Sequence, residues 1–389
     1  MKIDAIIIGQ NYSTNLGLIK AIGEAGYNCG VVKTATSSKT LKTPELRSKY
    51  VRKFVFANKY DEQDVLAKIM LFACDNYKRV LLPADDYCAL FIDNHINNLN
   101  KYFYTPNVNH KQSGLANYFD KALQQELVIK EGLKVPETWQ IDLSKTLEIP
   151  DCVKYPCITK PQISIGSPKS FIRRCKDPTE LNAIIKEIVA KQNSCKLLIE
   201  QFIEIENEYT VSGVAFEGQV LLPAFMKKTK TGLGIHKGVT IAGIVKDSSR
   251  YKTIKESICA FVNNMGFEGI FDVELLESNG KFYFNEINLR YGAAGYAVTR
   301  AGCNLPASFV NYCLKSEHPS TQIIQRELSF VSDKAALDNY SGGYISWKEY
   351  KKLLHQAEVR FIDHDDMEPY LNYVLNAIKI RFSKIIQNK

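Results

Sequence analysis

The first hundred residues alternate between apolar runs and helical patterns. Five segments carry this alternation, and they are 3–8, 13–26, 29–32, 60–77 and 79–83. The first, third and fifth are short apolar runs of the kind that form buried strands, whereas the second and fourth place apolar residues at helical spacing. Because strands that alternate with helices are typical of parallel sheets, we predict a parallel α/β domain over residues 1–112.

A second pattern, at residues 269–290, predicts a β-hairpin. Two alternating apolar runs flank Asn279 and Gly280, which supply the positive φ angles that a tight turn between strands requires. Successive side chains of a strand point to opposite faces, so polar residues two apart share a face. The shared faces carry five polar residues: Asp272 and Glu274 on the first strand, and Glu286, Asn288 and Arg290 on the second.

These oxygen-bearing side chains predict a metal site. Mg²⁺ prefers hard oxygen ligands and, in nucleotide sites, keeps positions open for phosphate oxygens. We therefore predict Asp272, Glu286 and Asn288 as Mg²⁺ ligands, with Glu274 as an alternative to Asp272 and Mn²⁺ as an alternative metal. The competing interpretation is a solvated acidic sheet face. The apolar run at 282–284 favours the metal site, because it suggests that the charges behind it are partly enclosed.

The stretch FYFNEINLR at 282–290 resembles the hairpin of the ATP-grasp superfamily, and the following YGAAGYAVT is most similar to its D-aspartate-ligase-like branch of carboxylate–amine ligases. The resemblance covers roughly residues 1–325. It implies that residues 1–112 are a Rossmann-like domain preceding the ATP-grasp fold, which is made of two α+β subdomains over 113–325. The smaller lid subdomain would lie at about 120–200. Residues 326–389 would be a C-terminal extension that packs on the core.

The same resemblance implies a set of ATP contacts: Lys121, Lys160, Ser164, Gly166, Ser167, Glu200, Gln201, Phe202, Ile203 and Glu208. Lys160 ends an apolar strand just before a proline, so it should point inward to the phosphates. The loop that follows has one glycine where many relatives have several, which implies a stiffer lid. The segment 200–203 would contact adenine and Glu208 the ribose hydroxyls.

Two further residues are expected to take part in catalysis. Arg290 follows the metal ligands and its planar fork suits a carboxylate or an acyl phosphate. Lys228 lies in a basic, glycine-punctuated segment and is expected to face the γ-phosphate or a carboxylate. We predict an ATP-dependent carboxylate–amine ligase of the amino-acid type that forms an acyl phosphate and releases ADP and phosphate. The alternatives are carbamoyl-phosphate-synthase-like chemistry and a non-catalytic nucleotide-binding protein.

Charge disfavours nucleic acid as a partner but does not identify which small molecule is bound. The net charge of +8 comes from Lys and Arg spread along the chain, without the dense cluster expected of a nucleic-acid-binding protein. The ten cysteines and six histidines lack zinc-ligand spacing, which favours free thiols in a reducing cytoplasm. The apolar run at 6–8 is too short for a signal peptide or a membrane span, so we expect no membrane insertion. A homodimer is compatible with these features.

Two observations concern the N-terminal domain. The first turn, residues 9–17, lacks the Gly-x-Gly-x-x-Gly pattern, which disfavours NAD binding. Asp85 and Asp86 follow an apolar strand at the edge where open α/β sheets bind ligands. They are either part of the pocket for the acceptor substrate or ordinary surface residues of a turn.

Overall fold

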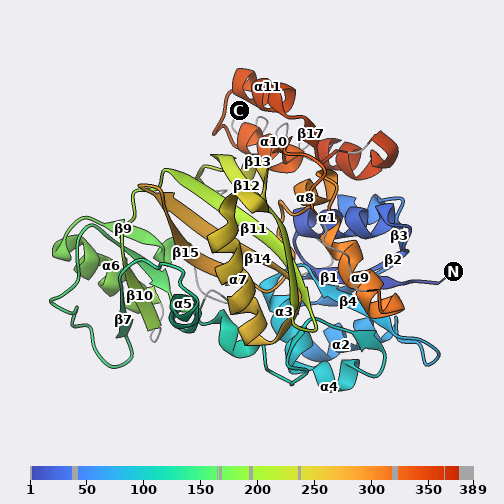
Figure 1. The fold of residues 1–389 in the computed structure, drawn as a ribbon, viewed down its shortest axis with the longest axis horizontal. Helices are drawn as coiled ribbons and strands as arrows, with labels where there is room; N and C mark the ends of the chain where they lie inside the picture. The colour runs from blue at the N-terminus through green and yellow to red at the C-terminus, as the bar shows by residue number, and fades with distance from the viewer. Residues whose placement is uncertain are drawn as a thin grey trace, which may run out of the picture.

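The computed structural model describes residues 2–36, 43–163, 165, 169–191, 196–234, 238–317, 323–362 and 364–375. Three β-sheets organise these residues (Figure 1), with the N-terminal sheet at one end, a small antiparallel sheet at the other and a large sheet between them. None of the described helices combines the length and the apolar character needed to cross a lipid bilayer.

The N-terminal sheet is parallel throughout, which confirms the predicted fold class. Its strands, in spatial order, are β3 (Val51–Asn58), β2 (Cys29–Ala35), β1 (Ala5–Gly9), β4 (Arg79–Pro83) and β5 (Phe103–Tyr104). The accompanying helices are α1 (Tyr12–Glu24), α2 (Glu62–Met70), α3 (Asp86–Asn94) and α4 (Ile96–Leu99). The sequence pattern predicted a helix to residue 77, but α2 ends at Met70. The amides of Phe72 and Ala73 bond three residues back, so the last turn tightens and the helix ends.

The small sheet carries one of the predicted phosphate contacts. It is antiparallel, in the order β7 (Thr138–Asp142), β10 (Lys196–Gln201), β8 (Cys157–Pro161) and β9 (Arg173–Cys175). Helix α6 (Pro178–Lys191) packs on it through the apolar residues Leu181, Ile185 and Ile188. Helix α5 (Lys121–Lys130) precedes this sheet in the chain and lies beside the large one. We refer to the small sheet with α6 as the lid.

The large sheet contains the predicted hairpin. Its main path runs through β15 (Lys281–Asn288), β14 (Phe267–Ser278), β11 (Asn207–Phe216), β12 (Gln219–Thr231), β13 (Thr240–Asp247), β16 (Leu328–Val331) and β17 (Val359–Arg360), and β6 (Asn107–Val108) pairs with the start of β14. Helix α7 (Lys252–Met265) covers one face. Asn279 and Gly280 have φ angles of 50° and 65°, so the turn has the predicted conformation.

The end of the chain returns to the beginning. The hairpin is followed by helices α8 (Tyr296–Arg300), α9 (Leu305–Lys315), α10 (Asp333–Ser341) and α11 (Trp347–Gln356), and by a helical segment at 368–375. Short 3₁₀ turns occur elsewhere in the chain, at Pro44–Arg47, Ala116–Phe119, Lys169–Phe171, Ser248–Tyr251 and His364–Asp366. Helices α8 and α9 pack on α1. The ammonium group of Lys20 on α1 donates to the carbonyl of Phe361 at 2.8 Å. The C-terminal segment therefore contacts both the N-terminal domain and the large sheet.

Candidate functional site

The polar residues of the candidate site are brought together by strand register. Residues that lie directly opposite each other in an antiparallel pair share a face of the sheet. Five such pairs join β12, β11, β14 and β15: Lys228 with Glu208, Thr210 with Glu274, Ser212 with Asp272, Glu274 with Glu286, and Asp272 with Asn288. The three predicted metal ligands, the predicted ribose contact and the predicted catalytic lysine thus lie on one face.

Asp272 is the most enclosed carboxylate of this face. Only 3% of its surface is exposed, and its carboxylate accepts a hydrogen bond from the Ser212 hydroxyl. Burial raises the pKa of Asp272 to about 6, and the Ser212 hydroxyl and the Arg290 charge act in the opposite direction. A Cβ atom on Gly292 would lie 1.5 Å from Oδ2 of Asp272, so only glycine allows the backbone to pass this close.

Glu286 pairs with the predicted phosphate contact Lys121. The Lys121 ammonium lies 2.9 Å from Oε2 of Glu286. Burial alone would raise the pKa of Glu286, but the charges of Lys121, Lys160 and Arg290 outweigh it and hold the pKa below its ordinary value. Glu286 is therefore ionised at neutral pH and available to a cation.

Lys160 belongs to a buried network that joins the lid to the hairpin. Its ammonium lies 2.5 Å from Oε2 of Glu200 and donates to Oδ1 of Asn285 at 2.8 Å. The other oxygen of Glu200 accepts from the Gln125 side chain at 2.8 Å. Asn285 reaches Lys160 because the register of β14 and β15 slips between Glu274 and Leu275, and such a bulge redirects a side chain. Sequence reasoning missed Asn285 and Gln125.

Lys228 is held between two carboxylates. Its ammonium, on a side chain that is 5% exposed, lies 3.3 Å from Glu208 and 3.6 Å from Glu274. Burial lowers the pKa of Lys228, but Glu274 and Glu208 together raise it above its ordinary value. Lys228 therefore carries a fixed positive charge rather than acting as a base. Glu274, the alternative metal ligand, lies between this lysine and Glu286.

Arg290 connects the hairpin to the N-terminal domain. Its Nε donates to Oδ1 of Asp86 at 2.9 Å, and Nη2 donates to Oδ1 of Asn288 at 3.3 Å. Burial lowers the pKa of Arg290, but the charges of Asp86 and Asp272 have the larger effect and raise the pKa above its ordinary value. The guanidinium therefore stays charged. The neighbouring Asp85 caps α3 and accepts from the amide of Gln10 at 2.7 Å. The two aspartates are thus part of the junction at the carboxyl edge of the parallel sheet.

The residues expected to contact adenine differ in their exposure to solvent. Glu200 is 1% exposed and engaged with Lys160, whereas Gln201 is exposed. The amides of Gln201 and Phe202 donate to the carbonyls of Glu137 and Pro156, at 2.8 and 3.0 Å. The resemblance implies that the backbone of residues 201–203 contacts the base. Two of the three amides in that segment therefore already have partners in the protein.

Two further predictions concern the loop after Lys160 and the metal site. Ser164, Gly166 and Ser167 are not among the described residues. Over the part of the chain that is described, no three His, Cys, Asp or Glu side chains are grouped closely enough to hold a metal by themselves. The proposed ligand set differs from such a group because its third member is an amide, Asn288.

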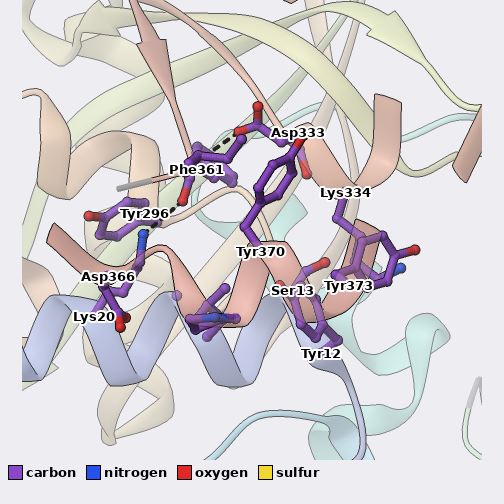
Figure 2. Close-up of a pocket in the computed structure, with 15 residues that line it drawn as sticks. Tyr12, Ser13, Lys20, Tyr296, Asp333, Lys334, Phe361, Asp366, Tyr370 and Tyr373 are labelled. Carbon is purple, nitrogen blue, oxygen red and sulfur yellow. Dashed lines mark hydrogen bonds between the residues drawn. The ribbon is translucent and has the colours of Figure 1, made fainter. Parts of the chain in front are cut away.

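A separate cleft lies between α1 and the C-terminal segment (Figure 2), and none of the predicted site residues lines it. Its walls include five aromatic residues, Tyr12, Tyr296, Phe361, Tyr370 and Tyr373. Each of its four charged side chains has a partner inside the protein: Lys20 with the Phe361 carbonyl, Asp333 with Arg360, Lys334 with Asp338 and Asp366 with Ser48. The cleft is therefore part of the packing of the C-terminal segment on α1.

Comparison with known sequences identifies one domain. Residues 126–307 match the family model of the ATP-grasp domain. The carbamoyl phosphate synthase large chain of Clostridium beijerinckii is 23% identical over 176 residues, which is 44% of this chain and 16% of that protein. The corresponding protein of Methanosarcina barkeri is 22% identical over 166 residues, 41% of each chain. This chain thus spans less than half the length of these relatives.

Comparison with solved structures shows a shared fold over most of the chain. L-amino acid ligase from Bacillus licheniformis has a TM-score of 0.62 and 18% identity, covering 84% of this chain and 79% of that one. N5-carboxyaminoimidazole synthetase from Staphylococcus aureus, complexed with ADP, has a TM-score of 0.64 and 17% identity, covering 88% and 86%. Biotin carboxylase from Campylobacter jejuni has a TM-score of 0.65 and 15% identity, covering 84% and 75%.

Proposed function

The chain carries an ATP-grasp domain, and we propose that it is an ATP-dependent ligase that joins a carboxylate to an amine with release of ADP and phosphate. One observation carries the proposal: two carboxylates and an amide share a sheet face, with Lys121 paired to Glu286 and Arg290 donating to Asn288. Phosphoryl transfer depends mainly on positioning and on neutralising charge, and this arrangement can supply both.

The cations of the site are proposed to bind the ATP phosphates. Lys121 and Lys160 form ion pairs with Glu286 and Glu200, respectively. When ATP enters, each ammonium can exchange part of its carboxylate contact for a phosphate oxygen. Lys228, held by Glu208 and Glu274, adds a third fixed positive charge on the same face.

Asp272, Glu286 and Asn288 are proposed to hold Mg²⁺, with Mn²⁺ as an alternative. The donors suit these ions because all three offer hard oxygens and leave positions for phosphate oxygens. Burial makes the ionised form of Asp272 costly, so this carboxylate gains from a nearby divalent cation. Bound there, the ion would neutralise phosphate charge.

The pair of Arg290 and Asp86 supports an amino-acid substrate. The guanidinium fork can hold a carboxylate, and the Asp86 carboxylate beside it can accept from an ammonium group. A substrate carboxylate oxygen would attack the γ-phosphorus while the bond to ADP breaks, which gives an acyl phosphate. An amine nitrogen would then attack the acyl carbon, phosphate would leave, and the nitrogen would lose a proton to form the amide.

The reaction class is tested with a panel of amino acids and amines. We expect release of ADP and phosphate only when a suitable acid is present, and trapping of the acyl phosphate by hydroxylamine. The Arg290→Lys variant keeps the charge but loses the fork, so it should lower the rate far more than it weakens ATP binding. Arg250→Lys, on the exposed surface, serves as the control. Release of AMP would exclude the mechanism, and ATP binding without any turnover would favour a non-catalytic nucleotide-binding protein.

A second candidate function is the phosphorylation of bicarbonate or carbamate. The carbamoyl phosphate synthase relatives favour it, although they match less than half of this chain. This candidate predicts that bicarbonate alone supports ADP release and that carbamoyl phosphate accumulates when ammonia is supplied. That result would replace the carboxylate–amine assignment.

A further inference from the structure

The strand that carries two of the proposed metal ligands lies at the edge of the large sheet. Among the described strands, β15 pairs only with β14, apart from an isolated bridge between Tyr283 and Lys134, and Ile287 lies between Glu286 and Asn288. The amide and the carbonyl of Ile287 form their hydrogen bonds on the side of the strand that faces away from β14. An edge strand held from one side only can shift or fray, so its outer contacts affect where the flanking side chains point.

The Gln124 side chain takes the place of a neighbouring strand at this position. Its Oε1 accepts from the amide of Ile287 at 3.1 Å, and its Nε2 donates to the carbonyl of Ile287 at 3.2 Å. The same Nε2 donates to the carbonyl of Tyr118 at 2.6 Å, and Gln124 is 3% exposed. A planar amide with one donor and one acceptor reproduces the bonds that a strand would make.

Gln124 belongs to a helix that contacts the site through three residues, Lys121, Gln124 and Gln125. On α5, Lys121 pairs with Glu286 one turn earlier, and Gln125 donates to Glu200. Further along the same outer edge of β15, the amide of Phe284 donates to the carbonyl of Lys134 at 2.7 Å. The bulge at Asn285 therefore lies between two fixed points on the edge of the strand.

We propose that Gln124 is a positioning residue, which holds the Ile287 backbone so that Glu286 and Asn288 present their oxygens together to the divalent cation. The proposal rests on the proposed function for the identity of the ligand. Groups that orient metal ligands without touching the metal typically change metal affinity by about 10- to 100-fold when they are removed.

The test uses the Gln124→Met variant, which keeps the length of the side chain and removes both bonds to Ile287. Hydrogen exchange of the Ile287 amide should accelerate. ADP affinity should be measured by calorimetry with Mg²⁺ and in EDTA. We expect the gain in ADP affinity from Mg²⁺ to fall by about tenfold in the variant, with little change in EDTA. Glu126→Gln, on the exposed face of the same helix, should leave both measurements as in the wild type.

Several outcomes would overturn the proposal. One is unchanged exchange at Ile287. Another is faster exchange with an unchanged effect of Mg²⁺, which would make Gln124 structural only. Equal loss of ADP affinity with and without Mg²⁺ would place the effect on the nucleotide instead. If Gln124→Met does not fold, Gln124→Glu keeps the acceptor for the Ile287 amide and should show a smaller change in the same direction. A wild-type protein that binds no MgADP would refute the proposed function, whereas the exchange measurement judges the Gln124 contact separately.

Discussion

Side chains of the candidate site form ion pairs, of which Lys160–Glu200 is buried and Lys121–Glu286 is partly exposed at its glutamate. Lys160 pairs with Glu200 and Lys121 pairs with Glu286, and all four lie at the interface of the lid, α5 and the hairpin. Removing one partner of a buried pair leaves an uncompensated charge, which typically costs about 3–5 kcal/mol. Ligand binding and stability are therefore linked at these residues.

The Lys160→Met variant tests this link. It keeps the apolar stem but removes the charge, so Glu200 is left buried without its cation. We expect the free energy of unfolding to fall by about 3–5 kcal/mol and ATP affinity to fall by about 10- to 100-fold. Lys154→Met removes an exposed pair with Glu137 in the lid and should change stability by less than about 1 kcal/mol. Calorimetric ATP binding equal to the wild type would remove Lys160 from the phosphate site.

Asp272 predicts a dependence of stability on pH. Its pKa is raised to about 6 in the folded protein, so between about pH 4 and pH 6 the unfolded chain is ionised while the folded chain holds the proton. Raising the pH through this window should lower stability by roughly 3 kcal/mol. In EDTA, Asp272→Asn should be more stable than the wild type at pH 7.5, and the difference should vanish near pH 4. Chemical denaturation measures it, with exposed Asp75→Asn as the control. A difference that does not depend on pH would contradict the pKa assignment.

The sequence predicted some of these residues for physical reasons and missed others. Lys160 was predicted because a lysine before a proline at the end of an apolar strand has few directions to point. Asn285 was not, because strand alternation places it away from Glu286, and only the bulge redirects it. Gln124 bonds to a residue 163 positions away, and a single sequence contains no signal for such a contact.

Among the elements, α5 contacts both the lid and the hairpin. Its N-cap, Asp120, accepts from the amides of Ala122 and Leu123 and, through its other oxygen, from the Gln162 side chain at 2.7 Å. The amide of Lys121 also donates to the Gln162 carbonyl at 3.0 Å. The start of the helix is therefore attached to the end of the lid strand β8.

The Asp120→Ala variant separates these two roles of the cap. Loss of an N-cap typically costs about 1 kcal/mol of stability. Asp61→Ala is the matched control, because Asp61 caps α2 by accepting from the amide of Asp64. Both variants should lose stability in thermal unfolding, and Asp120→Ala should lose more because it also leaves Gln162 without its acceptor. Only Asp120→Ala should weaken ATP binding, because it also releases Gln162. Equal ATP affinity in the two variants would mean that the attachment does not position the lid.

Short-range signals predicted some elements, and long-range pairing determined the rest. The hairpin was predicted because Asn279 and Gly280 set the turn through their own φ angles. The pairings of β14 with β11 and of β13 with β16 were not predicted, since the two strands of each pair are distant in the sequence. Helix α2 ended earlier than its pattern indicated because its last turn tightens beyond Met70.

At the scale of the whole molecule, the C-terminal segment closes the structure. The sequence predicted an extension that packs on the core, but its few motifs gave no sign that β16 joins the large sheet beside β13. The segment also reaches the N-terminal domain, where Asp366 accepts from the Ser48 hydroxyl at 2.6 Å and from the amide of Lys49 at 2.9 Å. The C-terminal segment is therefore held to the N-terminal domain by two hydrogen bonds at Asp366, one buried and one part-buried.

The Asp366→Ala variant tests how much this closure contributes to stability. The substitution leaves a buried hydroxyl and a backbone amide without their acceptor, and each such group typically costs about 1–3 kcal/mol. Thermal and chemical unfolding should show a loss in that range, whereas Glu368→Ala, at an exposed position two residues further on, should lie within about 0.5 kcal/mol of the wild type. Combining Asp366→Ala with Ser48→Ala should cost less than the sum of the two single changes, because the hydroxyl that lost its acceptor is then absent. Additive losses would mean that Ser48 and Asp366 stabilise the protein independently, and the hydrogen bond between them would then not be what couples the C-terminal segment to the N-terminal domain.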